Sequence, residues 1–346
     1  MELTTLWFIL IAVLWIGYFV LEGFDFGVGM LLPVLGRTEA ERRAMITTLG
    51  PLWDGNEVWV LVAGGATFAA FPEWYATLFS GFYLPLFLIL LGLILRGVAF
   101  EYRSKRGEPT WRARWDAAIV FGSFVPALLW GVAFANIVRG VPLEVVNGNI
   151  EYAGGFFNLL NPFALLGGVT FLAVFLTHGA IFLSLKTHGS IRDGAHKVGM
   201  RTGAVATVLA VAYLLWAQLV YSDKGWTWIP VLLAAAAWLV AMAMHRQRFE
   251  GWAFTFSAAT IAMAVVALFG MLFPHVLPNV SGGEPALTTT NASSTHYTLT
   301  IMTWVAVLFV PVVLGYQSWT YWVFRKRISA EDIVDPEHGS LDEVHV

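Results

Sequence analysis

The stretch LEGFDFGVG, residues 21–29, places two carboxylates inside an apolar run long enough to cross a membrane. On insertion scales, each ionised carboxylate near the centre of such a helix costs roughly 2.5–3.5 kcal/mol. Glu22 and Asp25 are three residues apart and share one helix face, and the flanking glycines let another helix or a cofactor approach closely. We therefore expect the functional site in this region.

The composition defines the class of protein. Hydrophobic residues make up 58% of the chain and charged residues 12%, whereas about 25% of an ordinary soluble domain is charged. A mean hydropathy of +0.69 agrees with a polytopic membrane protein. The absence of cysteine excludes disulfides, thiolate-bound metals and haem or iron–sulfur centres held by cysteine. A net charge of -3 without a basic patch argues against nucleic acid.

Apolar runs of about 20 residues predict an all-α, polytopic integral membrane protein with nine transmembrane helices. The N-terminus lacks a basic region and a small-residue cleavage site, so the first run is expected to stay as a span. The predicted spans are residues 4–35, 50–70, 75–102, 115–138, 161–186, 199–221, 228–245, 252–275 and 297–324.

The distribution of basic residues predicts the orientation. All but three of the 20 lysines and arginines lie in alternate connecting segments and in the C-terminal tail. Arg139 and Lys224 lie in the other segments, and Arg96 lies within a span. Because basic residues stay on the cytoplasmic side, the N-terminus is expected outside and the tail from Arg325 inside.

A weak internal repeat suggests two four-helix units. Residues 19–23 can be aligned with residues 175–179, and residues 41–45 with residues 196–200, although a chance similarity between apolar helices is an alternative. The predicted organisation is residues 1–138 for the first four-helix unit, 139–275 for the second, 276–324 for an outer loop and the ninth helix, and 325–346 for a cytoplasmic tail. The tail is polar from Asp332 onward and is expected to be disordered.

Every acidic residue within a predicted span falls in its cytoplasmic half, and so do Arg96 and His178. The acids are Glu22, Asp25, Asp54, Glu57, Glu101 and Asp116. A line of carboxylates reaching in from one side favours proton uptake toward a buried site, whereas an alternating-access carrier more often has polar groups near the midplane. Asp54 and Glu57 are three apart on one face, and with Glu22 they form a candidate proton relay.

Each of these residues also has a structural interpretation. Glu101 and Asp116 are expected near the headgroups, where simple solvation accounts for them. Arg96 is deeper and should pair with Asp25 or Glu22, which would hold the first and third spans together whether or not the pair has a functional role. One base cannot pair with all the carboxylates of the first three spans, and unpaired, protonated carboxylates suit a relay.

No histidine is well placed as a metal ligand. A lone His178 beside a glycine on an apolar helix is more often hydrogen-bonded than bound to haem. His188 and His196 are placed in a basic inner loop, and residues 276–296 are interpreted as an irregular outer loop. Most tryptophans fit interfacial belts, but Trp59 does not.

Seven motifs in chain order closely resemble subunit II of the cytochrome bd quinol oxidases, and the resemblance covers essentially the whole chain. The motifs are Gly23–Gly29, Trp53–Trp59, Phe79–Tyr83, Phe100–Lys105, Gly122–Pro126, Asn158–Gly167 and Ile301–Val307.

The resemblance implies a subunit of a quinol:dioxygen oxidoreductase in a bacterial cytoplasmic membrane. Such an enzyme takes electrons from membrane quinol and reduces dioxygen to water with cytoplasmic protons. The family's b-type and d-type haems are liganded by subunit I, which also carries the quinol-oxidising loop. Subunit II supports the haem d region and can hold a structural quinone, and small single-helix subunits can join the complex.

The resemblance also implies residue roles. Asp25, Arg96 and Asp116 match positions that keep the haem d site intact, Asp54 matches the start of a proton route, and Trp59 matches a residue on the dioxygen path. Many relatives have aspartate where this chain has Glu22, which leaves the role of the longer side chain open.

Two alternatives from other classes are a proton-coupled transporter built from four-helix repeats and a scaffold subunit without a chemical role. Co-purification with a haem-containing partner distinguishes an oxidase subunit from a transporter. Oxygen consumption that survives changes at Asp54 and Glu57 would favour the scaffold.

Overall fold

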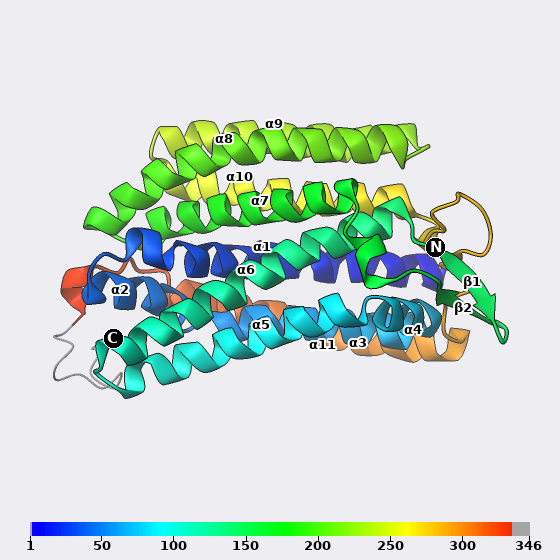
Figure 1. Ribbon diagram of the computed structural model, residues 1–346, viewed down its shortest axis with the longest axis horizontal. Helices are drawn as coiled ribbons and strands as arrows, with labels where there is room; N and C mark the ends of the chain where they lie inside the picture. Colours follow the sequence, from blue (N-terminus) through cyan, green and yellow to red (C-terminus); the bar gives the residue numbers. More distant parts are fainter. Residues whose placement is uncertain (1, 334–346) are drawn as a thin grey trace.

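The computed structural model describes residues 2–333, which form a bundle of helices running mostly along one direction (Figure 1). The described helices are α1 (Leu3–Leu35), α2 (Glu39–Leu49), α3 (Trp53–Ala70), α4 (Pro72–Gly81), α5 (Tyr83–Tyr102), α6 (Pro109–Arg139), α7 (Pro162–Lys186), α8 (Gly189–Val220), α9 (Trp228–Arg246), α10 (Glu250–Leu272) and α11 (His296–Val323). Two antiparallel hairpins, β1 (Leu143–Val146) with β2 (Asn149–Tyr152) and β3 (His275–Leu277) with β4 (Leu287–Thr288), are added to the all-α bundle.

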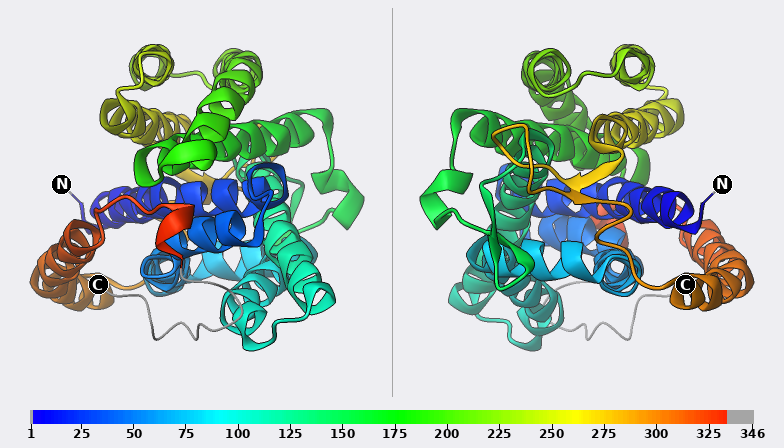
Figure 2. Two further views of the ribbon diagram at one scale, coloured as in Figure 1. Left: turned by 90° about the vertical axis from the view of Figure 1, so that its left-hand side faces the viewer. Right: turned by 90° about the vertical axis from the view of Figure 1, so that its right-hand side faces the viewer.

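Helix α1 lies at the centre of the bundle, where it packs against α3, α6, α7 and α10. Figure 2 shows α8 and α9 as an outer pair on one side, with α11 on the other side. The aromatic core is in the N-terminal half of α1, where Trp15 contacts Trp130 and Phe134 edge-on and the Trp130 indole donates to the Tyr18 hydroxyl at 3.1 Å. The two buried carboxylates, Glu22 and Asp25, lie in the C-terminal half of α1.

Eight described helices are long and apolar enough to cross a membrane, namely α1 and α5 to α11. The remaining predicted span corresponds to α3, which has 18 residues and begins with the polar sequence Trp53–Glu57. The structure thus agrees with a polytopic membrane protein.

Helices α1 and α7 come into backbone contact where Gly27 meets Gly179. A methyl group added at Gly179 would fall on the backbone of Gly27, so the approach requires glycine on both helices. Phe175 also packs against Gly23. The two segments aligned by the internal repeat, residues 19–23 and 175–179, are therefore in contact with each other. This close packing fixes the helix that carries Glu22 and Asp25.

Two predicted boundaries were wrong. The third span is divided at Phe82 into α4 and α5, because Pro85 has no N–H to offer the carbonyl of Gly81. The predicted inner loop before the sixth span is helical, since α8 begins at Gly189. His196 therefore lies on a helix, with its ring 4.7 Å from that of His245.

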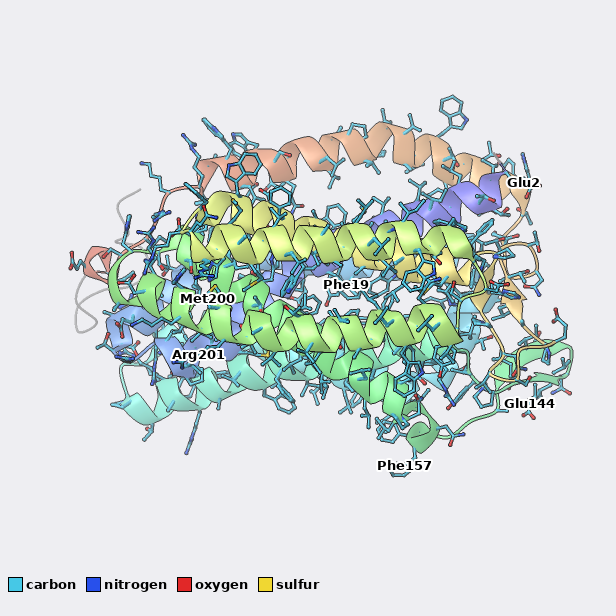
Figure 3. All side chains as sticks on the ribbon, turned by 90° about the horizontal axis from the view of Figure 1, so that it is seen from above. Glu2, Phe19, Glu144, Phe157, Met200 and Arg201 are labelled. Carbon is cyan, nitrogen blue, oxygen red and sulfur yellow. The ribbon has the colours of Figure 1, made fainter. Side chains whose placement is uncertain are left out.

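The predicted irregular outer loop, residues 276–296, contains β4 and the end of β3, and Val276, Leu277 and Leu287 are buried in it. Figure 3 shows Glu144 of β1 and Phe157 at the same end of the bundle as Glu2. Phe157 is 82% exposed. This end therefore carries the hairpins.

The start of the C-terminal tail is docked onto the opposite end of the bundle. The Lys186 ammonium donates to the carbonyls of Phe324 and Lys326, and the Ile328 amide donates to the Lys186 carbonyl at 2.8 Å. The expectation of disorder concerned the tail from Asp332, and most of that segment lies outside the described residues.

Candidate functional site: a buried acid–base cluster

An ion pair between α5 and α1 forms the centre of the site. The Arg96 guanidinium binds the Glu22 carboxylate, and neither side chain has exposed surface. Glu57 of α3 places its Oε1 3.8 Å from the Arg96 Nη2. The Phe26 ring lies under the guanidinium at 4.7 Å from the ring centroid. Three helices thus meet at one buried cation.

A second network connects Asp25 to α11. Asn56 donates to the Asp25 carboxylate at 2.8 Å and accepts from the Tyr321 hydroxyl at 2.8 Å and the Gln317 amide at 3.3 Å. Gln317 in turn accepts from the Trp59 indole at 3.2 Å. The Asp25 carboxylate is therefore held by one neutral hydrogen bond from Asn56 of α3, and α11 holds Asn56 in turn.

The structure decides which acid pairs with Arg96. The sequence left Asp25 and Glu22 as alternatives, and the described structure gives the ion pair to Glu22, whereas Asp25 bonds to Asn56. Both acids share one face of α1. The extra methylene of glutamate lets Glu22 reach α5, and the amide of Asn56 occupies the position next to Asp25.

Asp54 lies at the exposed start of α3, one turn before Glu57. Its carboxylate accepts from the Gly55 amide at 2.7 Å, as expected for an acid in the first turn of a helix. The Glu57 side chain is 18% exposed, so exposure falls stepwise from Asp54 through Glu57 to Glu22. The three predicted relay residues thus form a series of decreasing exposure.

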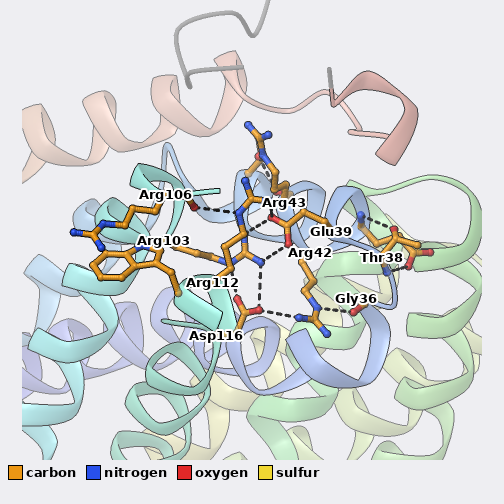
Figure 4. Close-up of polar contacts among 12 residues, drawn as sticks. Gly36, Thr38, Glu39, Arg42, Arg43, Arg103, Arg106, Arg112 and Asp116 are labelled. Carbon is orange, nitrogen blue, oxygen red and sulfur yellow. Dashed lines mark hydrogen bonds and ion pairs between the residues drawn. The ribbon is translucent and has the colours of Figure 1, made fainter. Parts of the chain in front are cut away.

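Asp116 is not solvated at headgroup level; it is ion-paired and 8% exposed (Figure 4). It accepts from the Arg103 Nε at 2.5 Å and from the Arg42 guanidinium at 3.0 Å. Arg103 also donates to both carboxylate oxygens of Glu39, at 2.7 and 2.9 Å. We call Glu39, Arg42, Arg103 and Asp116 the inner clasp. It joins α2 to α6 and to the end of α5.

The inner clasp was missed by sequence reasoning except for Asp116. Its charges fall in connecting segments, where charged residues are ordinarily solvated. Burial alone would raise the pKa of Glu39, but hydrogen bonds and charge from Arg103, together with the charges of Arg112 and Arg42, lower this pKa. Glu39 is therefore held as a carboxylate in the folded protein.

His178 uses both ring nitrogens within the protein. Its Nδ1 lies 2.7 Å from the Ser257 hydroxyl, its Nε2 lies 3.1 Å from the Val20 carbonyl, and its ring stacks on Phe254 at 4.8 Å. The hydrogen-bonded interpretation of His178 is confirmed. Within residues 2–333, no three histidine or carboxylate side chains are grouped to hold a metal ion. Because both ring nitrogens of His178 are hydrogen-bonded within the protein, neither is free to bind a haem iron.

Asn56, Gln317 and Tyr321 were also missed. Neutral polar residues cost less free energy in a membrane than charged ones, so they are a weaker sign of a functional site. Gln317 and Tyr321, however, are four residues apart on one face of an apolar helix. That spacing was a usable signal.

The fold and the site define an integral membrane protein with a buried acid–base cluster between α1, α3 and α5. The chain belongs to the cytochrome bd terminal oxidase subunit II family, whose model matches residues 3–324. It is 40% identical over 335 residues to the cytochrome bd ubiquinol oxidase subunit 2 of Bacillus subtilis, covering 96% of this chain and 98% of that protein.

Other relatives agree with this assignment. The cytochrome bd-I ubiquinol oxidase subunit 2 of Escherichia coli is 40% identical over 375 residues, covering 96% of this chain and 97% of that protein. A chain of the bd oxidase of Geobacillus thermodenitrificans has the same fold, with a TM-score of 0.77 at 16% identity, covering 94% of this chain and 99% of that chain. The chain is thus subunit II of a haem-containing quinol oxidase complex in a bacterial membrane.

Proposed function

We propose that this subunit carries protons from the cytoplasm toward the haems of a partner subunit and stabilises the neighbouring haem d site. The observation that carries this proposal is the stepwise burial of Asp54, Glu57 and Glu22, which ends at Arg96. A carboxyl group passes protons when it lies within hydrogen-bond reach of the next group, directly or through a water.

The charge balance of the cluster supports a relay. Arg96 is one cation among Glu22, Asp25 and Glu57, and an unpaired buried charge costs several kcal/mol. Electrical balance therefore requires the cluster to hold protons on its carboxyl groups. A group of acids that shares protons in this way can accept a proton at one side and release it at the other.

The haems are proposed to lie in subunit I, with b-type and d-type haem liganded there and quinol oxidised there. The hydrogen bonds that His178 makes on both ring nitrogens support this division. Asp25, Arg96 and Asp116 would act on haem d by holding α1, α3, α5 and α6 in place. Trp59 would line the path by which dioxygen enters. A structural quinone would bind this subunit, and small single-helix subunits would join the complex. The bound haems would transfer electrons to dioxygen.

The proposed topology has nine spans with the N-terminus outside. Helix α3 would be the remaining span, because its 18 residues extend about 27 Å, close to the ~30 Å hydrocarbon thickness. The cytoplasmic end would then contain the inner clasp and the docked start of the tail. Two four-helix units, residues 1–138 and 139–275, would follow from this count.

The scaffold alternative rests on one observation, because Asp54 also stabilises the N-terminus of α3. The deciding experiment is quinol-driven oxygen consumption by the assembled complex carrying Asp54→Asn and Glu57→Gln together. A relay predicts a large loss of turnover with intact haem spectra. Glu101→Gln, an exposed acid at the end of α5, is the matched control. Wild-type turnover in the double variant would favour the scaffold.

A further inference from the structure

A groove beside the inner clasp combines an apolar wall with a cationic end. It encloses a volume of about 560 Å³ between the end of α1 and the first half of α6. Its apolar lining includes Leu32, Pro33, Val120, Phe121 and Phe124, and its polar end is formed by Arg42 and Asp116. Phe121 and Phe124 are 44% and 43% exposed, so the groove opens on the outside of the bundle.

Arg42 is held in position but is not saturated. Its Nε donates to the Gly36 carbonyl at 2.8 Å, and one Nη1 hydrogen goes to Asp116 at 3.0 Å (Figure 4). A guanidinium has five N–H groups, so three are left without a partner among the described residues. The side chain is 33% exposed and forms part of the groove lining. A second acceptor can therefore bind Arg42 without breaking the inner clasp.

The charge around this end of the groove is positive. Arg37 follows Gly36, which Arg42 contacts, and Arg114 lies two residues before Asp116. Both are exposed, and neither has a carboxylate within ion-pair distance in the part of the chain that the structure describes. Asp116, the acid at the groove, is already paired with Arg42 and Arg103. An anion is thus the complementary ligand for this end.

The apolar wall has the length of a lipid chain within one leaflet. On α6 the lining residues Ala113, Ala117, Phe121 and Phe124 recur every three or four positions and form one stripe. At 1.5 Å per residue this stripe extends about 16 Å, close to half of the ~30 Å hydrocarbon thickness. The stripe starts at the cationic end and runs away from it.

We propose that this groove binds an anionic phospholipid, with its phosphate on Arg42 and one acyl chain along α6. Basic pockets between membrane helices on the cytoplasmic side are sites of this kind. A helix of a partner protein would cover the apolar stripe but would leave the donors of Arg42 without an anion. A phospholipid satisfies both ends of the groove.

The test is native mass spectrometry of the complete complex, purified with its partner subunit and supplied with either phosphatidylglycerol or phosphatidylcholine. We expect one phosphatidylglycerol to be retained per complex, with roughly tenfold weaker retention of phosphatidylcholine, because the choline cation offsets the phosphate charge and is repelled by the arginines at this end of the groove. Equal retention of the two lipids would overturn the proposal.

Ala117→Trp fills the groove without touching the inner clasp, and we expect it to abolish retention of that lipid. Ala243→Trp, at an exposed position of α9, is the matched control and should retain it. Should Ala117→Trp fail to assemble, Ala113→Leu narrows the polar end of the groove and should weaken retention. Unchanged retention in the groove variants, or loss of the partner subunit with the lipid still bound, would contradict a lipid site.

Discussion

Arg96 and Glu22 form an ion pair that no solvent reaches, between two helices separated by more than 70 positions in the sequence. These are two of the residues whose burial in a membrane costs the most free energy. A buried ion pair is seldom a large net source of stability, but removing one partner strands the other charge in a low dielectric. It therefore determines how α1, α3 and α5 can be assembled.

The first prediction tests this pair. Arg96→Gln should cost on the order of 3–5 kcal/mol in stability, because Glu22 loses its cation. Glu22→Gln should cost less, because Glu57 lies 3.8 Å from the guanidinium. The double variant should recover part of the loss seen in Arg96→Gln. Yield of assembled complex and its melting temperature are the measurements, and purely additive losses would rule out the coupling.

The second prediction concerns haem ligation. Because both ring nitrogens of His178 bond to this chain, His178→Gln should leave the number of haems per complex unchanged, although packing around Ser257 is disturbed. The chain expressed without its partner should bind no stoichiometric haem. Pyridine haemochrome analysis provides the count. Loss of one haem from the variant complex would make His178 a ligand.

The third prediction concerns the inner clasp and pH. Glu39 has a lowered pKa in the folded protein, so its contribution to stability is present above the ordinary glutamate pKa and is lost as pH falls through the folded value. The melting temperature gap between wild type and Glu39→Gln should thus be constant at neutral pH and should shrink in acid. Glu108→Gln, an exposed neighbour, serves as the charge control. A gap that widens in acid would contradict the assigned sign.

The fourth prediction concerns Asp54 at high pH. If Asp54 receives protons from the cytoplasm, Asp54→Asn should slow turnover, and the slowing should deepen as protons become scarce between about pH 6 and about pH 9. Haem spectra and assembly should be intact. A residue that only stabilises the start of α3 gives the same turnover as wild type throughout this range.

The sequence was sufficient to predict that Arg96 pairs with an acid of the first span, but not which acid it is. Glu22, Asp25 and Arg96 were recognisable because charge is costly in hydrocarbon wherever it lies on the helix. The choice of Glu22 over Asp25 depends on the rotation of α1 against α5 and on the position of Asn56, and neither is encoded in local sequence. Packing between distant helices determined both.

Connecting segments were the least predictable part. Charges such as Glu39 and Arg103 are unremarkable in a loop, and only their arrangement in space produces the inner clasp. The basic segment before the sixth span was expected to be a loop because it is polar, yet α8 continues through it and Arg192 pairs with Glu250 of α10. Polarity predicts exposure to water but does not end a helix.

Proton uptake itself tests the central claim most directly. The reduced complex is mixed with dioxygen in liposomes whose cytoplasmic face points outward, and a pH dye in the outer medium follows the protons taken up. The account predicts that Glu57→Gln slows this uptake strongly, whereas Glu101→Gln leaves it at the wild-type rate. Uptake at the wild-type rate in Glu57→Gln, with full haem content, would contradict a proton route through this subunit.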